Sequence, residues 1–137
     1  MATTAGVAAC GGPVRAPELP VPASVVDVDM SDFAFGHTPA AVAGRIVVRA
    51  RNVGRSPHEI VLVELPEDLP RSIDEQLRGP ERMGFPSVAY LPVHPPDTTG
   101  SFAIDLTPGR YAFICFVKDG AGREHARLGM SSELRVG

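Results

Sequence analysis

The 137-residue sequence predicts an all-β protein, a Greek-key β-sandwich of about seven short strands. Short apolar runs alternate with polar residues at a period of two, which is typical of strands buried on one face. Fourteen prolines and fourteen glycines lie among these runs and supply the frequent turns that a sandwich needs. Hydrophobic residues make up 44% of the chain, so a chain of this length can enclose one core.

Residues 1–24 are interpreted as a leader and tether in front of one domain at 25–137. The sequence Val-Ala-Ala-Cys at residues 7–10 resembles the end of a bacterial lipoprotein signal, in which Cys10 becomes lipidated. The charged and apolar segments of a full signal are missing, and a leader with an accidental Cys10 is the alternative. Residues 11–24 contain four prolines and no periodicity, which suits a tether.

Strand periodicity recurs along the rest of the chain. In the first strand, apolar Val26 and Val28 alternate with Asp27 and Asp29, so one face is buried and the other solvated. The region 66–86 is polar and irregular, with one or two helical turns expected over 72–78. The predicted strands are 25–35, 44–53, 60–65, 101–106, 110–117 and 133–136.

A local signature supports the sandwich. Thr107-Pro108-Gly109-Arg110-Tyr111 fits a tyrosine corner, in which a Tyr hydroxyl bonds to backbone a few residues upstream. The strand that follows places Tyr111, Phe113 and Cys115 on one face, because its side chains alternate. We therefore expect the Cys115 thiol to be shielded from water, either as a core residue or as a metal ligand.

Cys115, His125 and Met130 lie within sixteen residues of one another near the end of the predicted sandwich. Thiolate and thioether sulfur are soft ligands and imidazole is intermediate, a set that suits copper in both oxidation states. Taken singly, the Cys and the Met are explained as core residues and the His as a solvated side chain. Their joint occurrence favours a metal site. A disulfide between Cys10 and Cys115 is disfavoured, because one lies in a tether and the other faces the interior.

A type 1 copper site needs a second imidazole beside the thiolate, with a weak axial Met. The remaining histidines are His37, His58 and His94. His58 follows the turn 52–57 and opens a strand, so it lies at one end of the sandwich and is the preferred second ligand. His37 and His94 lie in predicted loops, and His94 is the first substitute for His58.

The segment from Asn52 to His58, with Tyr111, Cys115, His125 and Gly129-Met130, is similar to the plastocyanin and azurin family of type 1 copper proteins, the cupredoxins. The resemblance covers residues 25–136. It implies one copper ion with imidazole from His58 and His125, thiolate from Cys115 and axial sulfur from Met130. It also implies that Asn52 joins the two loops that carry the ligands.

The spacing of two of these residues departs from the family. Nine residues separate Cys115 from His125, whereas plastocyanins and azurins have two to four there. We expect the Asp119-Gly120 turn to absorb the excess as a small protrusion. In this respect the chain resembles cupredoxin-like proteins of the cell envelope that have a longer loop.

The function that the resemblance implies is one-electron transfer at the bacterial cell envelope, with His125 as the exposed edge and an unknown redox protein as partner. The lipoprotein interpretation adds an oxidising location outside the cytoplasm, with membrane contact only through a lipid on Cys10. The alternatives are a non-redox copper carrier or buffer and a metal-free cupredoxin-like interaction module.

Several other classes of function are disfavoured. The net charge of −3 argues against nucleic acid as a partner, because phosphate binding needs a basic surface. The sequence contains no run of 18 apolar residues, so no membrane-spanning helix is predicted. No Ser-His-Asp arrangement or carboxylate pair points to an enzyme, and we expect a monomer.

Overall fold

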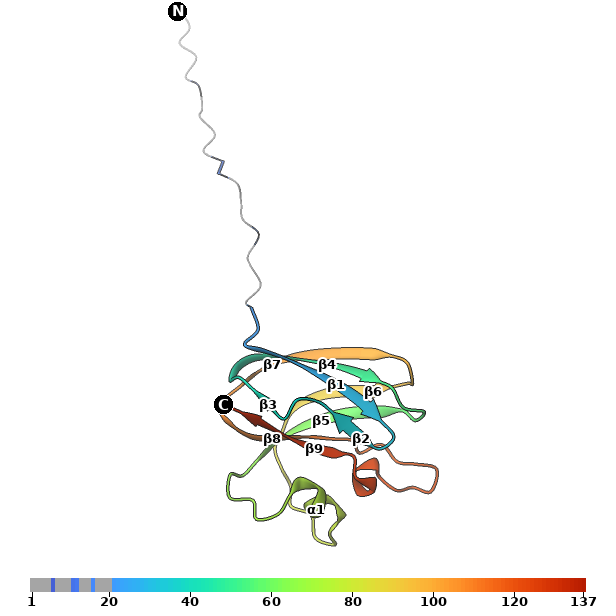
Figure 1. Ribbon diagram of the computed structural model, residues 1–137. Helices are drawn as coiled ribbons and strands as arrows, with labels where there is room; N and C mark the ends of the chain where they lie inside the picture. Colours follow the sequence, from blue (N-terminus) through green and yellow to red (C-terminus); the bar gives the residue numbers. More distant parts are fainter. Residues whose placement is uncertain (1–5, 7–10, 13–15, 17–20) are drawn as a thin grey trace, which may run out of the picture.

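The computed structural model describes residues 6, 11, 12, 16 and 21–137, and it is a two-layer β-sandwich (Figure 1). One layer contains β1 (Ser24–Ser31), β2 (Ala34–Gly36), β4 (Gly44–Asn52) and β7 (Thr99–Leu106). The other contains β3 (Ala40–Ala41), β5 (His58–Leu65), β6 (Ser87–His94), β8 (Gly109–Ile114) and β9 (Ser131–Val136). The predicted all-β sandwich is therefore confirmed.

Both sheets are mixed. The strand orders are β2-β1-β4-β7 and β3-β9-β8-β5-β6, with β1 parallel to β4, β3 parallel to β9, and the other pairs antiparallel. Parallel neighbours cannot be joined by a tight hairpin, so the chain crosses between the layers, as it does in Greek-key sandwiches.

The described residues form nine strands rather than about seven. The predicted strand 25–35 is a hairpin, β1 followed by β2, because the chain turns at Asp32 and Phe33. The edge strand β6 was not predicted. It contains Pro92, and Leu91 is its one fully buried side chain, so it has no clear alternation of buried and exposed residues.

The main core lies between the sheets and is built from alternate residues of each strand. In β1 the apolar side chains at 26, 28 and 30 are buried and Asp27 and Asp29 are exposed, as the periodicity predicts. Cys115 lies in this core with Tyr111 and Phe113, which confirms the predicted shared face. The Tyr111 hydroxyl donates to the Thr107 carbonyl oxygen at 2.8 Å, so the tyrosine corner is confirmed as well.

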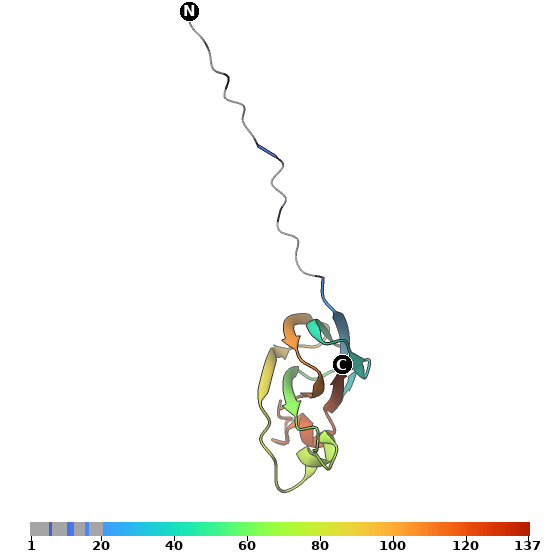
Figure 2. The same cartoon turned by 90° about the vertical axis from the view of Figure 1, so that its left-hand side faces the viewer.

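A second apolar cluster covers the outer face of the five-stranded sheet. The helix α1 (Ile73–Arg78) buries Ile73 and Leu77 against Ala112 and Ile114. Both views place α1 outside the strands (Figures 1 and 2). The helix was predicted at 72–78, and the Ser72 side chain caps it by accepting from the Glu75 N–H at 3.2 Å.

Some predictions concern residues that the structure does not describe. Cys10 lies outside the described residues, so the lipid anchor stays a prediction, and so does the division of the chain at residue 24. Among the residues described, no helix is long and apolar enough to cross a membrane.

Candidate metal centre

Three connections meet at one end of the sandwich, opposite the C-terminus in Figure 1. They are the β1–β2 turn at residues 32–33, the β4–β5 turn at 53–57, and the loop 115–130 that leads from β8 to β9. The last of these includes a short 3₁₀ helix, η1 (His125–Leu128). The predicted metal ligands all lie on these connections or at the adjoining strand ends.

His58 is the first residue of β5, and its side chain is 0% exposed. Its position depends on the turn before it, which the buried side chain of Asn52 organises. The Asn52 amide Nδ2 donates to the Ser56 and His94 carbonyl oxygens, both at 2.9 Å, and its Oδ1 accepts from the Gly54 N–H at 3.0 Å. Both N–H groups and the oxygen of this buried amide are therefore hydrogen-bonded, and they fix the β4–β5 turn and link it to the end of β6.

Cys115 lies one residue beyond β8, is fully buried and is a free thiol. Its backbone N–H donates to the Met130 carbonyl oxygen at 3.2 Å. Its sulfur accepts from the backbone N–H of Glu59 at 3.5 Å, and the Glu59 carboxylate accepts from the Phe116 N–H at 3.2 Å. Glu59 therefore ties the beginning of β5 to the segment that contains the thiol.

The long segment between Cys115 and His125 is a small hairpin. Lys118 and Glu124 form an antiparallel bridge, and the His125 N–H donates to the Val117 carbonyl oxygen at 2.8 Å. The Asp119 carboxylate closes the tip by accepting from the N–H groups of Ala121 and Arg123, both at 2.9 Å. The predicted protrusion at Asp119-Gly120 is confirmed, and its internal hydrogen bonds return the chain to the site.

His125 begins η1 and Met130 follows it after one short turn. The Met130 N–H donates to the His125 carbonyl oxygen at 3.0 Å, across Gly129, whose positive φ of 102° favours glycine. Met130 is 0% exposed and packs in the main core with Cys115. Met130 is thus bonded through its backbone to both of the neighbouring predicted ligands.

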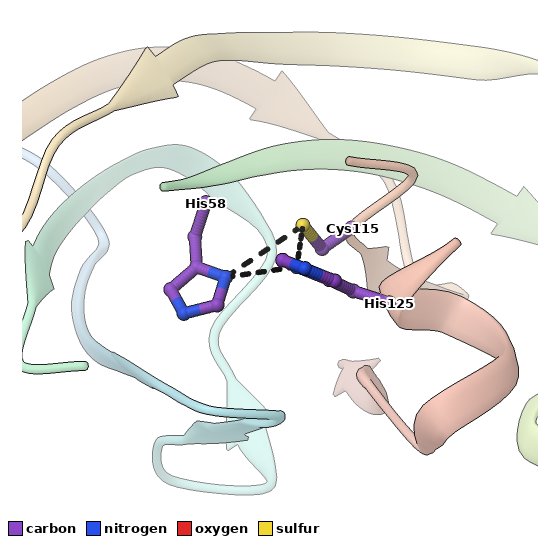
Figure 3. A group of neighbouring side chains, drawn as sticks. All are labelled: His58, Cys115 and His125. Atoms are coloured by element: carbon purple, nitrogen blue, oxygen red, sulfur yellow. Dashed lines mark hydrogen bonds between the residues drawn. The ribbon is translucent and has the colours of Figure 1, made fainter. Parts of the chain in front are cut away.

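The side chains of His58, Cys115 and His125 converge in the protein interior (Figure 3). The two Nδ1 atoms lie 3.2 Å apart, and the Cys115 sulfur lies 3.6 Å from Nδ1 of His125 and 4.0 Å from Nδ1 of His58. Among the described His, Cys, Asp and Glu residues, these three form the one group whose ligand atoms lie close enough together to hold a metal ion.

The triangle has the size of a metal site. A point at its centre lies about 2.1 Å from each of the three atoms, and Zn²⁺ takes about 2.0 to 2.3 Å to imidazole nitrogen and thiolate sulfur. Two imidazoles and one thiolate in a plane are also the donor set of a type 1 copper site. The residues present therefore fit a copper ion in size and in chemistry.

Burial sets the protonation of the three groups. It lowers the pKa of His58, although Asp32 partly opposes the shift, and it lowers the pKa of His125, with the neighbouring His58 acting in the same direction. Burial raises the pKa of the Cys115 thiol, against the opposing backbone N–H groups of Glu59 and Val117. Both imidazoles thus favour the neutral form, which is the form that binds metals.

Two residues of the β1–β2 turn cover the site, and sequence reasoning missed both. Asp32 Oδ1 lies 2.7 Å from Nε2 of His58, and the ring of Phe33 lies 4.6 Å from that of His125, tilted by 54°. The pKa of Asp32 is raised by burial, but hydrogen bonds from Arg55, His58 and Ser56 outweigh this, and the net shift is downward. The turn gave no signal because 25–35 looked like one continuous strand.

Two expectations about the site are wrong. His125 is not an exposed edge, because Phe33 lies against its ring and the residue is 1% exposed. Asn52 does not join the two ligand loops but links the β4–β5 turn to His94 at the end of β6. Glu59 makes the connection to the Cys115 segment instead.

The other histidines lie apart from the cluster. His37 bonds to the Ser132 hydroxyl at 2.8 Å and packs edge-on against Phe113, and His94 ends β6 with Nδ1 near the Pro92 carbonyl oxygen. The far nitrogen of His125, Nε2, is hydrogen-bonded by no described residue. Ser131 Oγ is the one buried side-chain N or O atom without a hydrogen-bond partner in the described part of the chain.

Comparisons of the sequence with protein-family models and with curated proteins give no match. The structure is similar to several solved ones. Reduced auracyanin from Roseiflexus castenholzii is 21% identical, with 86% of this chain and 99% of that chain covered and a TM-score of 0.57. Auracyanin A, described as a blue copper protein from Chloroflexus aurantiacus, is 22% identical, with 82% and 98% covered and a TM-score of 0.54.

Reduced rusticyanin is also similar, at 15% identity, with 86% of this chain and 82% of that chain covered and a TM-score of 0.56. These matches extend over nearly the whole of each chain, so they concern the sandwich as a unit and not a shared hairpin. Together with the nine-strand topology and the buried cluster at one end, they show that this chain has the cupredoxin fold.

Proposed function

We propose that this protein binds one copper ion through His58, Cys115, His125 and Met130 and carries single electrons. The observation that carries the proposal is the triangle of two Nδ1 atoms and one sulfur, fully buried and sized for a metal ion. A similar structure, auracyanin A, is described as a blue copper protein. Met130 would be the fourth ligand, because it is buried and its backbone is hydrogen-bonded to both His125 and Cys115.

Each residue has a distinct part in this proposal. When bound, copper supplies a one-electron couple between Cu(I) and Cu(II). Cys115 supplies the thiolate, and the N–H of Glu59 donates to its sulfur, a contact that tunes the potential of such sites. His58 and His125 supply neutral imidazole nitrogens, and Met130 supplies a weak sulfur contact.

The rigidity of the site favours electron transfer over copper delivery. His58 lies on a strand, and the ends of the loop 115–130 are tied by backbone hydrogen bonds from Cys115 to Met130 and from His125 to Val117. Because the donors are held in place by the protein, little movement accompanies a change of oxidation state. A carrier that passes copper onward needs a site that opens, and this one is buried.

We also propose that the protein is not an enzyme. The four proposed ligands would leave the copper ion no vacant position for a substrate, and Phe33 and Asp32 lie against the two imidazoles. Its partner in this proposal is another redox protein, and the chain acts as a monomer. The location proposed is the outer side of a bacterial membrane, with Cys10 as a lipid anchor, supported by the lipoprotein-like residues 7–10.

Titration of the purified full chain with Cu(II) tests the proposal. We expect one intense thiolate-to-copper absorption band that saturates at one copper per chain, together with the electron paramagnetic resonance signal of a single site. Cys115→Ser should abolish the band, whereas Met130→Leu should keep it and shift the potential. Copper binding without the band, or a band retained in Cys115→Ser, would contradict the assignment.

A further inference from the structure

We infer that Asp32 is a positioning residue of the metal centre, which selects the ring nitrogen that His58 offers to the metal and lowers the reduction potential. The inference rests on the proposed copper function. It concerns a residue of the β1–β2 turn that lies outside the four proposed ligands.

The Asp32 carboxylate is held in a fixed position. Its Oδ1 lies 2.7 Å from Nε2 of His58 and accepts from the Ser56 N–H at 3.2 Å, and its Oδ2 accepts from the Arg55 N–H at 2.9 Å. The side chain is 25% exposed, so protein surrounds most of it. Because the backbone of the β4–β5 turn binds both oxygens, the carboxylate has one orientation toward the imidazole.

This contact determines which ring nitrogen of the His58 imidazole carries the hydrogen. A carboxylate is an acceptor, so Nε2 of His58 carries the N–H and donates it to Asp32. Nδ1 then keeps its lone pair, and this is the atom that faces Cys115 and His125. Without the carboxylate, the Nδ1 atoms of His58 and His125, 3.2 Å apart, can share a hydrogen with either ring as the donor, so a share of the protein would present an N–H of His58 to the metal.

Gly54 gives independent support, because its lack of a side chain makes the contact possible. A Cβ on Gly54 would lie 2.4 Å from Oδ1 of Asp32 and 2.9 Å from Nε2 of His58. Any other residue at this position would therefore push the carboxylate and the imidazole apart. The absence of a side chain at Gly54 therefore allows the Asp32 carboxylate and the His58 imidazole to come within hydrogen-bonding distance.

The charge of Asp32 also acts on the metal. A carboxylate hydrogen-bonded to a ligand imidazole makes that ligand more basic and stabilises the more positive oxidation state. Nε2 of His125 has no such partner among the described residues, so the effect comes from the His58 side alone. Removing the charge while keeping the shape should therefore favour Cu(I) and raise the reduction potential.

Two variants and one control separate these roles. Asp32→Asn keeps the shape and removes the charge, and we expect the thiolate band to remain while the Cu(II)/Cu(I) equilibrium shifts by about tenfold toward Cu(I), which corresponds to 59 mV. Asp29→Asn removes an equal charge from the exposed face of β1 and should leave the potential close to that of the unsubstituted protein.

The tautomer is read without copper. In the metal-free protein, nitrogen NMR of the His58 ring should show the hydrogen on Nε2, and Asp32→Ala should show a mixture of tautomers. If Asp32→Asn moves the potential no more than Asp29→Asn does, or if Asp32→Ala leaves the tautomer unchanged, the inference is wrong. Failure of the unsubstituted protein to bind copper would instead overturn the proposed function, and the NMR result would still decide the tautomer role.

Discussion

The two imidazoles of the metal centre present the same atom to the cluster, but different groups hold the far side of each ring. His58 begins a strand, is 0% exposed, and has its far nitrogen bonded to Asp32 at 2.7 Å. His125 begins a 3₁₀ turn, is held through its backbone, and has an aromatic ring, Phe33, against its face. No described residue bonds its far nitrogen.

This difference separates two ways of holding a buried imidazole. The His58 side is fixed by a charge and by two turns, so its imidazole has a single orientation. The His125 side is fixed by backbone hydrogen bonds and by packing against Phe33, and no described residue bonds its Nε2. In the proposed function, a carboxylate therefore orients the His58 ligand, whereas the main chain and an aromatic ring orient the His125 ligand.

Exchanging each imidazole for an added one tests this comparison with the largest expected effect. Both His58→Gly and His125→Gly should lose the thiolate-to-copper band. Free imidazole should restore the band more fully in His125→Gly, because no described residue bonds the far nitrogen of that ring. It should restore less in His58→Gly, because the added ring has to bind copper through one nitrogen and donate to Asp32 through the other. Absorption spectra during an imidazole titration measure this.

The unsubstituted protein with added imidazole controls for direct attack on the metal. Equal restoration in both glycine variants would show that Asp32 places no extra demand on the ring at position 58, and the contrast between the two sides would then fail.

Gly54→Ala disturbs the contact between Asp32 and His58 and leaves the His125 side unchanged. The added Cβ would lie 2.4 Å from Asp32 Oδ1, so we expect the free energy of unfolding to fall by about 1–3 kcal/mol, the usual cost of overpacking. Gly120→Ala, on the hairpin of the other side, adds a Cβ that meets nothing within 4 Å and should change stability by less than about 0.5 kcal/mol. Denaturant unfolding of the two variants compares them, and a harmless Gly54→Ala would mean that the turn is not packed as described.

Much of the fold could be predicted from the sequence because its signals are local. Alternation of apolar residues identified β1, and the tyrosine corner at Tyr111 fixed the start of β8. The edge strand β6 was not predicted because it contains Pro92 and buries too few side chains to show an alternation of apolar and polar residues. The β1–β2 hairpin was missed because only two residues, Asp32 and Phe33, separate the strands, and apolar residues continue on both sides of them.

The site divides in the same way. Cys115, His125 and Met130 are close in the sequence, so their joint occurrence could be recognised, and the strand-opening position of His58 was the remaining clue. Asp32, Phe33 and Glu59 act on residues far away in the sequence, at separations that no spacing rule covers. Sequence reasoning could thus propose the atoms that face the metal, but not the groups that orient them.

Phe33→Ala affects the His125 side of the metal centre. It removes the ring that packs 4.6 Å from His125, and we expect the free energy of unfolding to fall by about 1–2 kcal/mol because Phe33 is only partly buried. The reduction potential should move less than in Asp32→Asn, since no charge is removed. Phe33→Leu keeps most of the apolar contact and serves as the control. Unfolding curves and potentiometry on each variant measure the two effects, and a potential shift as large as that of Asp32→Asn would contradict the division of roles.

The smallest expected effect concerns the hairpin that carries His125. The N–H of Arg123, followed by that of Ala121, outweighs burial and holds the pKa of Asp119 below its ordinary value of 3.8. A lowered pKa in the folded state means that the ionised carboxylate stabilises the protein above pH 3.8, and that this contribution is lost as the pH falls through the lowered pKa. Asp119→Ala should therefore lower the melting temperature at neutral pH, and the difference from the unsubstituted protein should shrink in acid.

Asp68→Ala, which removes an exposed carboxylate far from the centre, controls for the loss of charge alone. Thermal unfolding across the acid range gives the comparison, and a difference that does not depend on pH would assign the hairpin's stability to its backbone hydrogen bonds instead. That outcome would still fit the contrast between the two sides, since His125 would then be positioned by the main chain alone, whereas His58 depends on a side-chain carboxylate.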